Sequence, residues 1–291
     1  MSRALPPDQI VIAPEDRRDA VIDVIRRARA RIGLSLFRAN DKQVFGELER
    51  AVDRGVDVEV LVTSRAKGGK KKREKLWRAL EATGAAIYPY NDAVVKYHAK
   101  YLIADNGPAL VSSLNFTRKC FNKTCDAIVV THDPAVVEGL NRLMLADREG
   151  RPLPDDLTER LIVGPETARR QLTSLVGQAR SSIRLIDAKL SDPGLLSLLN
   201  QRRVEGVTVE VYDAKRYAGQ VSHGKIMLID GVRAVVGSLA FAALSLDFRR
   251  EVAIVVDEPA AIAGIEELFR FVATAAAKDS EIEANAGGGA A

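Results

Sequence analysis

The chain consists of two similar halves, and this internal repeat constrains its fold more than any single element does. Segment 10–15, Ile-Val-Ile-Ala-Pro-Glu, matches segment 161–166, Leu-Ile-Val-Gly-Pro-Glu. Segment 55–60, Gly-Val-Asp-Val-Glu-Val, matches segment 206–211, Gly-Val-Thr-Val-Glu-Val, at the same offset of 151 residues. A repeat of this length is a domain-sized unit and not a solenoid module. We therefore expect two copies of one fold within the 291 residues.

Helical and strand patterns alternate in the same order in both halves. The first half predicts helices at 16–30, 43–54 and 134–146 and strands at 32–37, 57–63, 100–104, 109–112 and 127–131. The second half predicts helices at 166–179, 194–204 and 259–275 and strands at 183–186, 208–213, 225–229, 234–237 and 252–256. This alternation predicts an α/β fold made of two α/β sandwich halves related by a pseudo-twofold axis. We expect the halves to span residues 1–150 and 151–279, with a linker at 147–156 and a disordered tail at 280–291.

The composition indicates a globular protein without a membrane span. Hydrophobic residues make up 47% of the chain and charged residues 28%, as in ordinary globular domains. No apolar run approaches the roughly 20 residues that a spanning helix needs, and the N-terminus lacks the apolar segment of a signal peptide. Two cysteines cannot form a disulfide framework. These features favour a cytoplasmic location.

Two short motifs with identical spacing carry the chemistry. His98 and Lys100 precede Asp105 as His223 and Lys225 precede Asp230, and the chain has only three histidines. Residues two apart on a strand point to the same face, so each motif presents an imidazole beside an ammonium group. Two such pairs in one cleft suit a phosphodiester: one histidine attacks phosphorus, the other protonates the leaving oxygen, and the lysines neutralise the oxygens. This chemistry needs neither a metal nor another cofactor, and we expect none.

Acidic residues are duplicated with the motifs. Asp126 follows Ser113 by the same interval as Glu251 follows Ser238. A buried carboxylate that accepts a hydrogen bond from Nδ1 fixes the histidine tautomer and leaves Nε2 free, so we assign Asp126 and Glu251 this orienting role.

The other polar residues of the motifs have alternative roles. Asp105 and Asp230 stand beside turn signals, which favours a structural role in the turn over a catalytic one. Ser113, Asn115 and Ser238 follow the motifs. They are candidates either to donate hydrogen bonds to substrate phosphate or to tie the motif strands together.

A basic segment distinguishes the first half from the second. The offset between the copies falls from 151 to 125 at the histidines, so the first half carries 26 extra residues, which include the basic run Arg65–Lys75. Such a run attracts nucleic acid or an anionic membrane. The alternative is a solvated loop that leads into a helix at 74–83.

The paired motifs resemble those of the phospholipase D superfamily, His-x-Lys-x4-Asp-x6-Gly-Ser-x-Asn, over nearly the whole chain. The resemblance implies that the halves pack together around one active site, complete within a single chain. It also implies a covalent phosphohistidine, usually on the first motif, which makes His98 the nucleophile and His223 the general acid. Lys100, Lys225 and Asn115 would then bind the phosphate.

The chain departs from this pattern at two positions. Ser112 replaces the usual glycine of the first motif, and Ala240 replaces the usual asparagine of the second. Both His/Lys pairs are intact, so we expect an active enzyme.

The resemblance leaves the substrate open, because the superfamily includes phospholipases, lipid synthases and nucleases. Our first hypothesis is a phosphodiesterase or phosphatidyltransferase that acts on phospholipids, with peripheral contact to the inner face of the membrane through Arg65–Lys75. The alternative is a nuclease that uses the same histidines. A third hypothesis is an inactive basic scaffold that binds nucleic acid or membrane.

Overall fold

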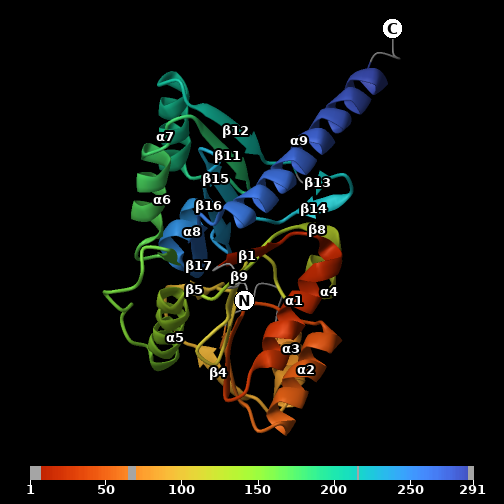
Figure 1. Cartoon of the computed structure of the whole chain (residues 1–291), viewed down its shortest axis with the longest axis vertical. Coiled ribbons are helices and arrows are strands. Elements are labelled where there is room, and N and C mark those ends of the chain that lie inside the picture. Colours follow the sequence, from red (N-terminus) through yellow and green to blue (C-terminus); the bar gives the residue numbers. More distant parts are fainter. Residues whose placement is uncertain (1–7, 65–69, 215, 288–291) are drawn as a thin grey trace, which may run out of the picture.

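The two halves stack on each other and repeat one architecture. The computed structural model describes residues 8–64, 70–214 and 216–287, with side chains up to residue 278. Figure 1 shows the first half, from red to yellow-green, below the second, from green to blue. Each half contains one main sheet, and the strand order of the second sheet repeats that of the first.

The sheet of the first half has the order β1-β9-β7-β6-β2-β3-β4. Its strands are β1 (Asp8–Val11), β2 (Arg31–Leu36), β3 (Asp57–Thr63), β4 (Ala86–Tyr90), β6 (Tyr101–Ala104), β7 (Ala109–Ser112) and β9 (Ile128–Thr131). Strands β2, β3 and β4 run parallel, and β6 pairs antiparallel with β2. The helices of this half are α1 (Pro14–Arg27), α2 (Lys42–Asp53), α3 (Lys70–Glu81), α4 (Arg118–Lys123) and α5 (Pro134–Glu149).

The sheet of the second half has the order β10-β17-β16-β15-β11-β12. Its strands are β10 (Leu161–Gly164), β11 (Ser182–Ile186), β12 (Thr208–Tyr212), β15 (Ile226–Ile229), β16 (Arg233–Gly237) and β17 (Arg249–Val256). The helices are α6 (Ala168–Gly177), α7 (Pro193–Val204), α8 (Ala243–Phe248) and α9 (Pro259–Gly287). The register repeats as well: Ile32 pairs with Ala104 in the first half, as Ile183 pairs with Ile229 in the second.

Short strands connect the halves. Strand β5 (Lys96–Tyr97) pairs with the start of β17, and β8 (Thr124–Cys125) pairs with β14 (Gln220–Ser222), which itself pairs with β13 (Arg216–Tyr217). In both connections a strand of one half therefore joins a strand of the other.

A single apolar core joins the two sheets. It contains Ile103 and Val129 of the first sheet together with Leu228 and Ile254 of the second, and α5 and α9 complete it. Separate apolar clusters lie on the outer faces, under α1 and α2 in one half and under α6 and α7 in the other. Because both faces of the central strands are covered, β6, β7 and β15 are buried along their whole length.

Matching ion pairs fix the start of the second helix in each half. The side chain of Asp41 accepts hydrogen bonds from the first backbone N–H groups of α2 and pairs with Arg18 at 3.0 Å. Asp192 caps α7 and pairs with Arg169 at 2.9 Å. An N-terminal aspartate satisfies free N–H groups and interacts favourably with the helix dipole.

The structure corrects three predicted segments. Helix α5 continues to Glu149, inside the predicted linker. Helix α9 runs to Gly287, so the backbone stays helical through the first part of the tail that was predicted to be disordered. Helix α3 begins at Lys70, so the second part of the basic run is helical and not a loop before residue 74; residues 65–69 lie outside the described residues.

None of the helices in the described ranges is long and apolar enough to cross a bilayer.

Candidate active site

Each histidine motif is hydrogen-bonded to the backbone of the other half. The N–H group of His98 donates to the carbonyl of Arg250 at 2.9 Å, next to the β5–β17 pairing. Gly224, inside the second motif, donates to the carbonyl of Cys125 at 2.7 Å, next to the β14–β8 pairing. Arg250 and Cys125 immediately precede Glu251 and Asp126 in sequence. The pairing of β5 with β17 and of β8 with β14 therefore brings each motif to the carboxylate of the opposite half.

The result is two crossed histidine–carboxylate pairs. Nδ1 of His98 lies 2.9 Å from Oε1 of Glu251. Nδ1 of His223 lies 3.1 and 3.2 Å from the two carboxylate oxygens of Asp126. Both carboxylates are fully buried, whereas the histidine side chains are 12% and 24% exposed. Because Nδ1 of each ring lies beside a carboxylate, Nε2 is left for chemistry.

Hydroxyl groups hold the carboxylates in place. Ser113 and Thr124 each donate to Asp126 at 2.6 Å. Ser245 donates to Glu251 at 2.6 Å, and the N–H group of Ala240 donates to it at 3.1 Å. Ala240, at the position of the missing asparagine, thus supports the carboxylate through its backbone.

Burial alone would raise the pKa of both carboxylates, but their partners lower it. For Asp126, the charge and hydrogen bond of His223, the charge of Lys225 and the hydrogen bond from Ser113 bring the pKa to about 2. The pKa of Glu251 is lowered by His98, Lys100 and Ser245. Both carboxylates are therefore ionised and can accept from imidazole throughout the neutral range.

Both imidazoles have a lowered pKa, which favours their neutral form at pH 7. Burial and the charge of Lys100 lower the pKa of His98 to about 3, against the opposing effect of Glu251. The charge of Lys225, followed by burial, lowers the pKa of His223. A bound phosphodiester anion would offset the lysine charges and raise both values.

The lysines lie beside their histidines, as the motif predicts, and they are also almost completely buried. Nζ of Lys100 donates to the carbonyl of His98 at 2.6 Å and lies 3.1 Å from its Nδ1. Lys225 donates to the carbonyl of His223. Burial lowers the pKa of Lys100 to about 7; Glu251 opposes this shift and Lys225 adds to it. Both motifs lie immediately before β6 and β15 and not within them.

Asn115 lies beside a histidine of the site, whereas the hydroxyls of the two serines bond within the protein. Nδ2 of Asn115 lies 3.5 Å from Nε2 of His223, and its buried Oδ1 accepts no hydrogen bond within the described part of the chain. The hydroxyl of Ser113 donates to Asp126 and accepts from the N–H group of Ala127. The Ser238 hydroxyl bonds to both backbone groups of Val252. These bonds match the second role considered, in which the serines tie the motif strands together, and phosphate binding by the serines stays a prediction.

The motif aspartates are structural, but their partners are not in their own turns. Asp105 accepts from the N–H groups of Arg29, Ala30 and Arg31, at 2.8–2.9 Å, where the chain enters β2. Asp230 accepts from the equivalent groups of residues 180–182 before β11. Both aspartates have a positive φ, of 51° and 54°, a conformation that Asp tolerates better than most residues. Each therefore fastens a neighbouring strand to the motif hairpin.

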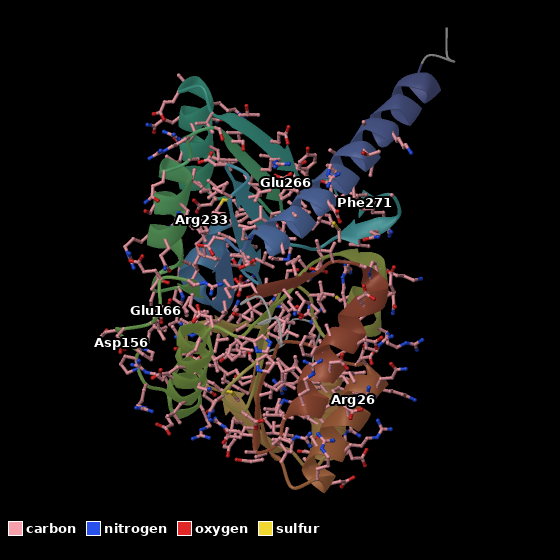
Figure 2. All side chains as sticks on the ribbon, in the orientation of Figure 1. Arg26, Asp156, Glu166, Arg233, Glu266 and Phe271 are labelled. Atoms are coloured by element: carbon pink, nitrogen blue, oxygen red, sulfur yellow. The ribbon has the colours of Figure 1, made fainter. Side chains whose placement is uncertain are left out.

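Three residues that the sequence did not single out support the site. The ring of Phe37 packs against His98 with centroids 4.4 Å apart, and Lys100 lies over the same ring. Arg17, fully buried, donates to the carbonyls of Thr124 and Asp126. Arg250, also buried, donates to Glu166, where the halves meet (Figure 2), and its Nε lies 2.8 Å from Asp147.

The repeat did not point to these three positions, because the matching position in the other half carries a different type of residue. Phe37 corresponds to Ala188, Arg17 to Ala168 and Arg250 to Cys125.

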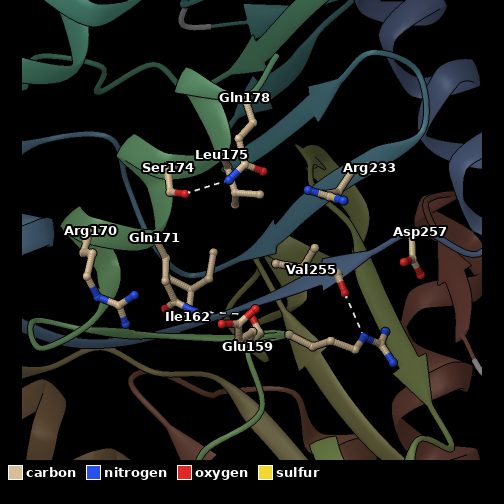
Figure 3. A pocket seen from close by; sticks show the side chains of 11 residues that line it. Glu159, Ile162, Arg170, Gln171, Ser174, Leu175, Gln178, Arg233, Val255 and Asp257 are labelled. Carbon is tan, nitrogen blue, oxygen red and sulfur yellow. Dashed lines mark hydrogen bonds between the residues drawn. The ribbon is translucent and has the colours of Figure 1, made fainter. Parts of the chain in front are cut away.

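A surface depression of about 320 Å³ lies away from the histidines (Figure 3). Its lining residues come from α6 and the neighbouring strand edges and include Arg170, Gln178, Arg233 and Asp257. None of the predicted site residues lines it. In the parts of the chain that the structure describes, no group of three or more His, Cys, Asp and Glu side chains is placed to hold a metal ion.

Similar structures share this fold across both halves. Polyphosphate kinase from Porphyromonas gingivalis has a TM-score of 0.72 and 19% identity, covering 89% of this chain and 46% of the kinase. Phosphatidylserine synthase from Haemophilus influenzae has a TM-score of 0.70 and 12% identity, covering 92% of this chain and 86% of the synthase.

Sequence comparisons identify the family. Cardiolipin synthase A of Pseudomonas aeruginosa is 28% identical over 127 residues, which is 43% of this chain; the chain spans only about a quarter (26%) of that relative. A family model described as "Cardiolipin synthase, PLD-like domain" matches residues 21–148 and 160–272, once in each half. Because these matches cover most of the chain, the protein belongs to the phospholipase D-like domain family of the cardiolipin synthase type.

Proposed function

We propose that the protein is a metal-independent phosphodiesterase or phosphatidyltransferase that acts on phospholipids through a phosphohistidine. The observation that carries this proposal is the pair of crossed histidine–carboxylate contacts, His98 with Glu251 and His223 with Asp126. Membership of the family supports chemistry on phosphodiesters in general. The cardiolipin synthase relatives favour a lipid substrate.

The first half of the reaction forms a bond between nitrogen and phosphorus. The electron pair on Nε2 of His98 attacks phosphorus as the bond to the leaving oxygen breaks, and His223, protonated when the anionic substrate raises its pKa, gives its proton to that oxygen. Lys100, Lys225 and Asn115 neutralise charge on the non-bridging oxygens.

The second half of the reaction regenerates the enzyme. His223, now neutral, takes a proton from water or an alcohol, whose oxygen attacks phosphorus while the bond to Nε2 of His98 breaks. Water gives hydrolysis, and an alcohol gives a transferred phosphatidyl group.

The basic start of α3 suits contact with an anionic surface. Lys70, Lys71, Lys72 and Lys75 are exposed on this helix. We propose that they hold the enzyme against anionic lipid at the inner face of the membrane, since each exposed cation near such a surface contributes about 1 kcal/mol.

The test is turnover in the presence of a chelator, on vesicles of anionic phospholipid and on DNA and RNA in parallel. His98→Ala is the blank, and His132→Ala is the matched control because this third histidine is not part of the site. Head-group release or exchange that depends on His98 supports the proposal. Cleavage of nucleic acid alone would replace it with a nuclease, and equal turnover by His98→Ala would refute the mechanism.

A further inference from the structure

Arg249 brings to the site a cation that the first half lacks. Its side chain is 27% exposed, and Nη1 lies 3.6 Å from Oε1 of Glu251, the same oxygen that His98 contacts. This separation is too long for a hydrogen bond, and the guanidinium makes none to any residue that the structure describes. The matching residue in the first half is Thr124, whose hydroxyl bonds directly to Asp126. The guanidinium therefore has donors available beside the reacting histidine.

The loop that carries Lys189 lies next to the site. Its N–H group donates to Asp187 at 2.9 Å, and the other oxygen of Asp187 accepts from the N–H group of Phe241 at 2.7 Å. The loop is thereby fixed against Ala240, where the family's asparagine is missing. The exposed Lys189 ammonium has no hydrogen-bond partner in the described ranges. Partial burial, then the charges of Lys225 and Arg249, lower the pKa of Lys189, and the charges of Asp187 and Glu251 oppose this shift.

The number of cations exceeds what one phosphodiester requires. The ionised carboxylates of Asp126 and Glu251 offset the charges of the buried Lys100 and Lys225. A phosphodiester carries a single negative charge and therefore offsets only one of Arg249 and Lys189, so the remaining cation favours a ligand with a second negative charge. Arginine in particular matches phosphate with paired N–H donors.

We propose that Arg249 and Lys189 form a second anion subsite, which binds another phosphate of the same substrate molecule next to the reacting phosphodiester. The inference rests on the proposed function only in placing the reacting phosphate at His98. The substrate is then a phospholipid whose head group carries a phosphate of its own. A nucleotide with a neighbouring phosphate offers the same chemistry, and the test separates the two.

The first experiment is titration calorimetry with inorganic phosphate and with pyrophosphate, which needs no turnover. We expect the wild type to bind pyrophosphate at least tenfold more tightly than phosphate. Arg249→Gln should reduce this ratio at least fivefold, Lys189→Gln should reduce it less, and Arg249→Lys should restore part of it. Arg233→Gln removes the same charge on the surface of the second half (Figure 2) and should leave the ratio unchanged.

Two results would overturn the subsite. One is an equal loss of phosphate and pyrophosphate affinity in Arg249→Gln, which would mean that Arg249 acts only through Glu251. The other is the same change in ratio for Arg233→Gln, which would make the effect one of net charge.

Turnover then identifies the source of the second phosphate. Phosphatidylglycerol is compared with phosphatidylglycerol phosphate, and p-nitrophenyl thymidine 5′-phosphate is compared with its 3′-phosphorylated form. Arg249→Gln should raise KM several-fold for the phosphorylated lipid only. The same effect confined to the nucleotide pair would overturn the lipid assignment. If neither lipid were turned over while the wild type still bound pyrophosphate more tightly than phosphate, the proposed function would be refuted and the subsite supported.

Discussion

Asn115 of the first half reaches the histidine of the second, with Nδ2 3.5 Å from Nε2 of His223. The other half offers no equivalent, because Ala240 occupies the matching position. The two histidines therefore have different surroundings: the ring of His98 is covered by Phe37, and His223 has an amide donor beside it. This asymmetry is consistent with different roles in one reaction.

Asn115→Ala should reduce kcat about 10²-fold, the usual effect of losing one donor to a charged transition state. Steady-state kinetics on the best substrate measures this, and circular dichroism checks that the fold is unchanged. Unaltered kcat would show that Asn115 only fills space beside His223.

His223→Ala should separate the two chemical steps. A p-nitrophenyl phosphodiester has a leaving group that needs no proton, so attack by His98 should persist while removal of the phosphoryl group slows for want of a base. We expect a burst of p-nitrophenol equal to the enzyme concentration and a mass increase on the peptide that contains His98. The mirror variant, His98→Ala, should show neither. A burst of equal size in both variants would contradict the assignment.

The rate should fall on the alkaline side as Lys100 loses its proton. Its pKa is about 7, so the ammonium is present below that pH and absent above it. Because kcat/KM reports the free enzyme, it already falls above the lowered pKa of His223, and it should decline more steeply as the pH rises through 7. Lys100→Arg should move this decline to higher pH, because arginine stays charged. A wild-type profile that is flat from about pH 6 to 9 would exclude Lys100 as the titrating group.

Asp105 and Asp230 should matter for stability more than for chemistry. Each accepts three backbone hydrogen bonds, and losing charge-assisted bonds costs about 1.5–3 kcal/mol in the free energy of unfolding. Urea denaturation should show this loss for Asp105→Ala and less for Asp105→Asn, which keeps an acceptor and tolerates the positive φ.

The pH dependence of the same effect has a definite sign. The pKa of Asp230 is lowered to about 2, where the backbone hydrogen bonds outweigh the opposing effect of burial. Its contribution to stability is therefore complete above the pKa of the unfolded chain, about 4, and is lost as the pH falls toward 2. Asp230→Asn should remove this part of the acid sensitivity.

Replacing Lys70, Lys71 and Lys72 with serine should weaken binding to anionic vesicles and flatten its dependence on salt. Vesicle co-sedimentation over a range of salt concentrations measures this. The control removes three arginines near α6, at positions 170, 180 and 233, and should have less effect. Equal losses in the two triple variants would indicate attraction by net charge alone.

The sequence predicted the architecture and most of the site residues because both depend on repeated, local patterns. The strands around the motifs, such as 100–104 and 109–112, are apolar runs separated by turn residues. The crossed pairing could not be predicted, since the matched spacing of Asp126 and Glu251 does not say which histidine each one meets. That choice depends on β5 and β8, strands of two residues each that form only by pairing with the other half.

Contacts between residues far apart in sequence also explain which other features of the site the sequence did not predict. Arg17 and Arg250 satisfy carbonyl groups far away in sequence, which no local pattern reports. Ser113 and Ser238 occupy motif positions, and only the structure shows that their hydroxyls bond to the backbone of Ala127 and Val252.

The pairing of β5 and β8 with strands of the second half has a consequence for how such a protein can be divided. Neither half contains both members of a histidine–carboxylate pair, so separately expressed fragments, cut between α5 and β10, should be inactive alone and regain activity only on mixing. A single copy of the repeat could complete the site only as a symmetric dimer, with each subunit supplying the carboxylate for its partner's histidine. When both copies lie in one chain, matching positions need not carry the same residue type. Asn115 therefore differs from its counterpart Ala240, and Thr124 differs from its counterpart Arg249.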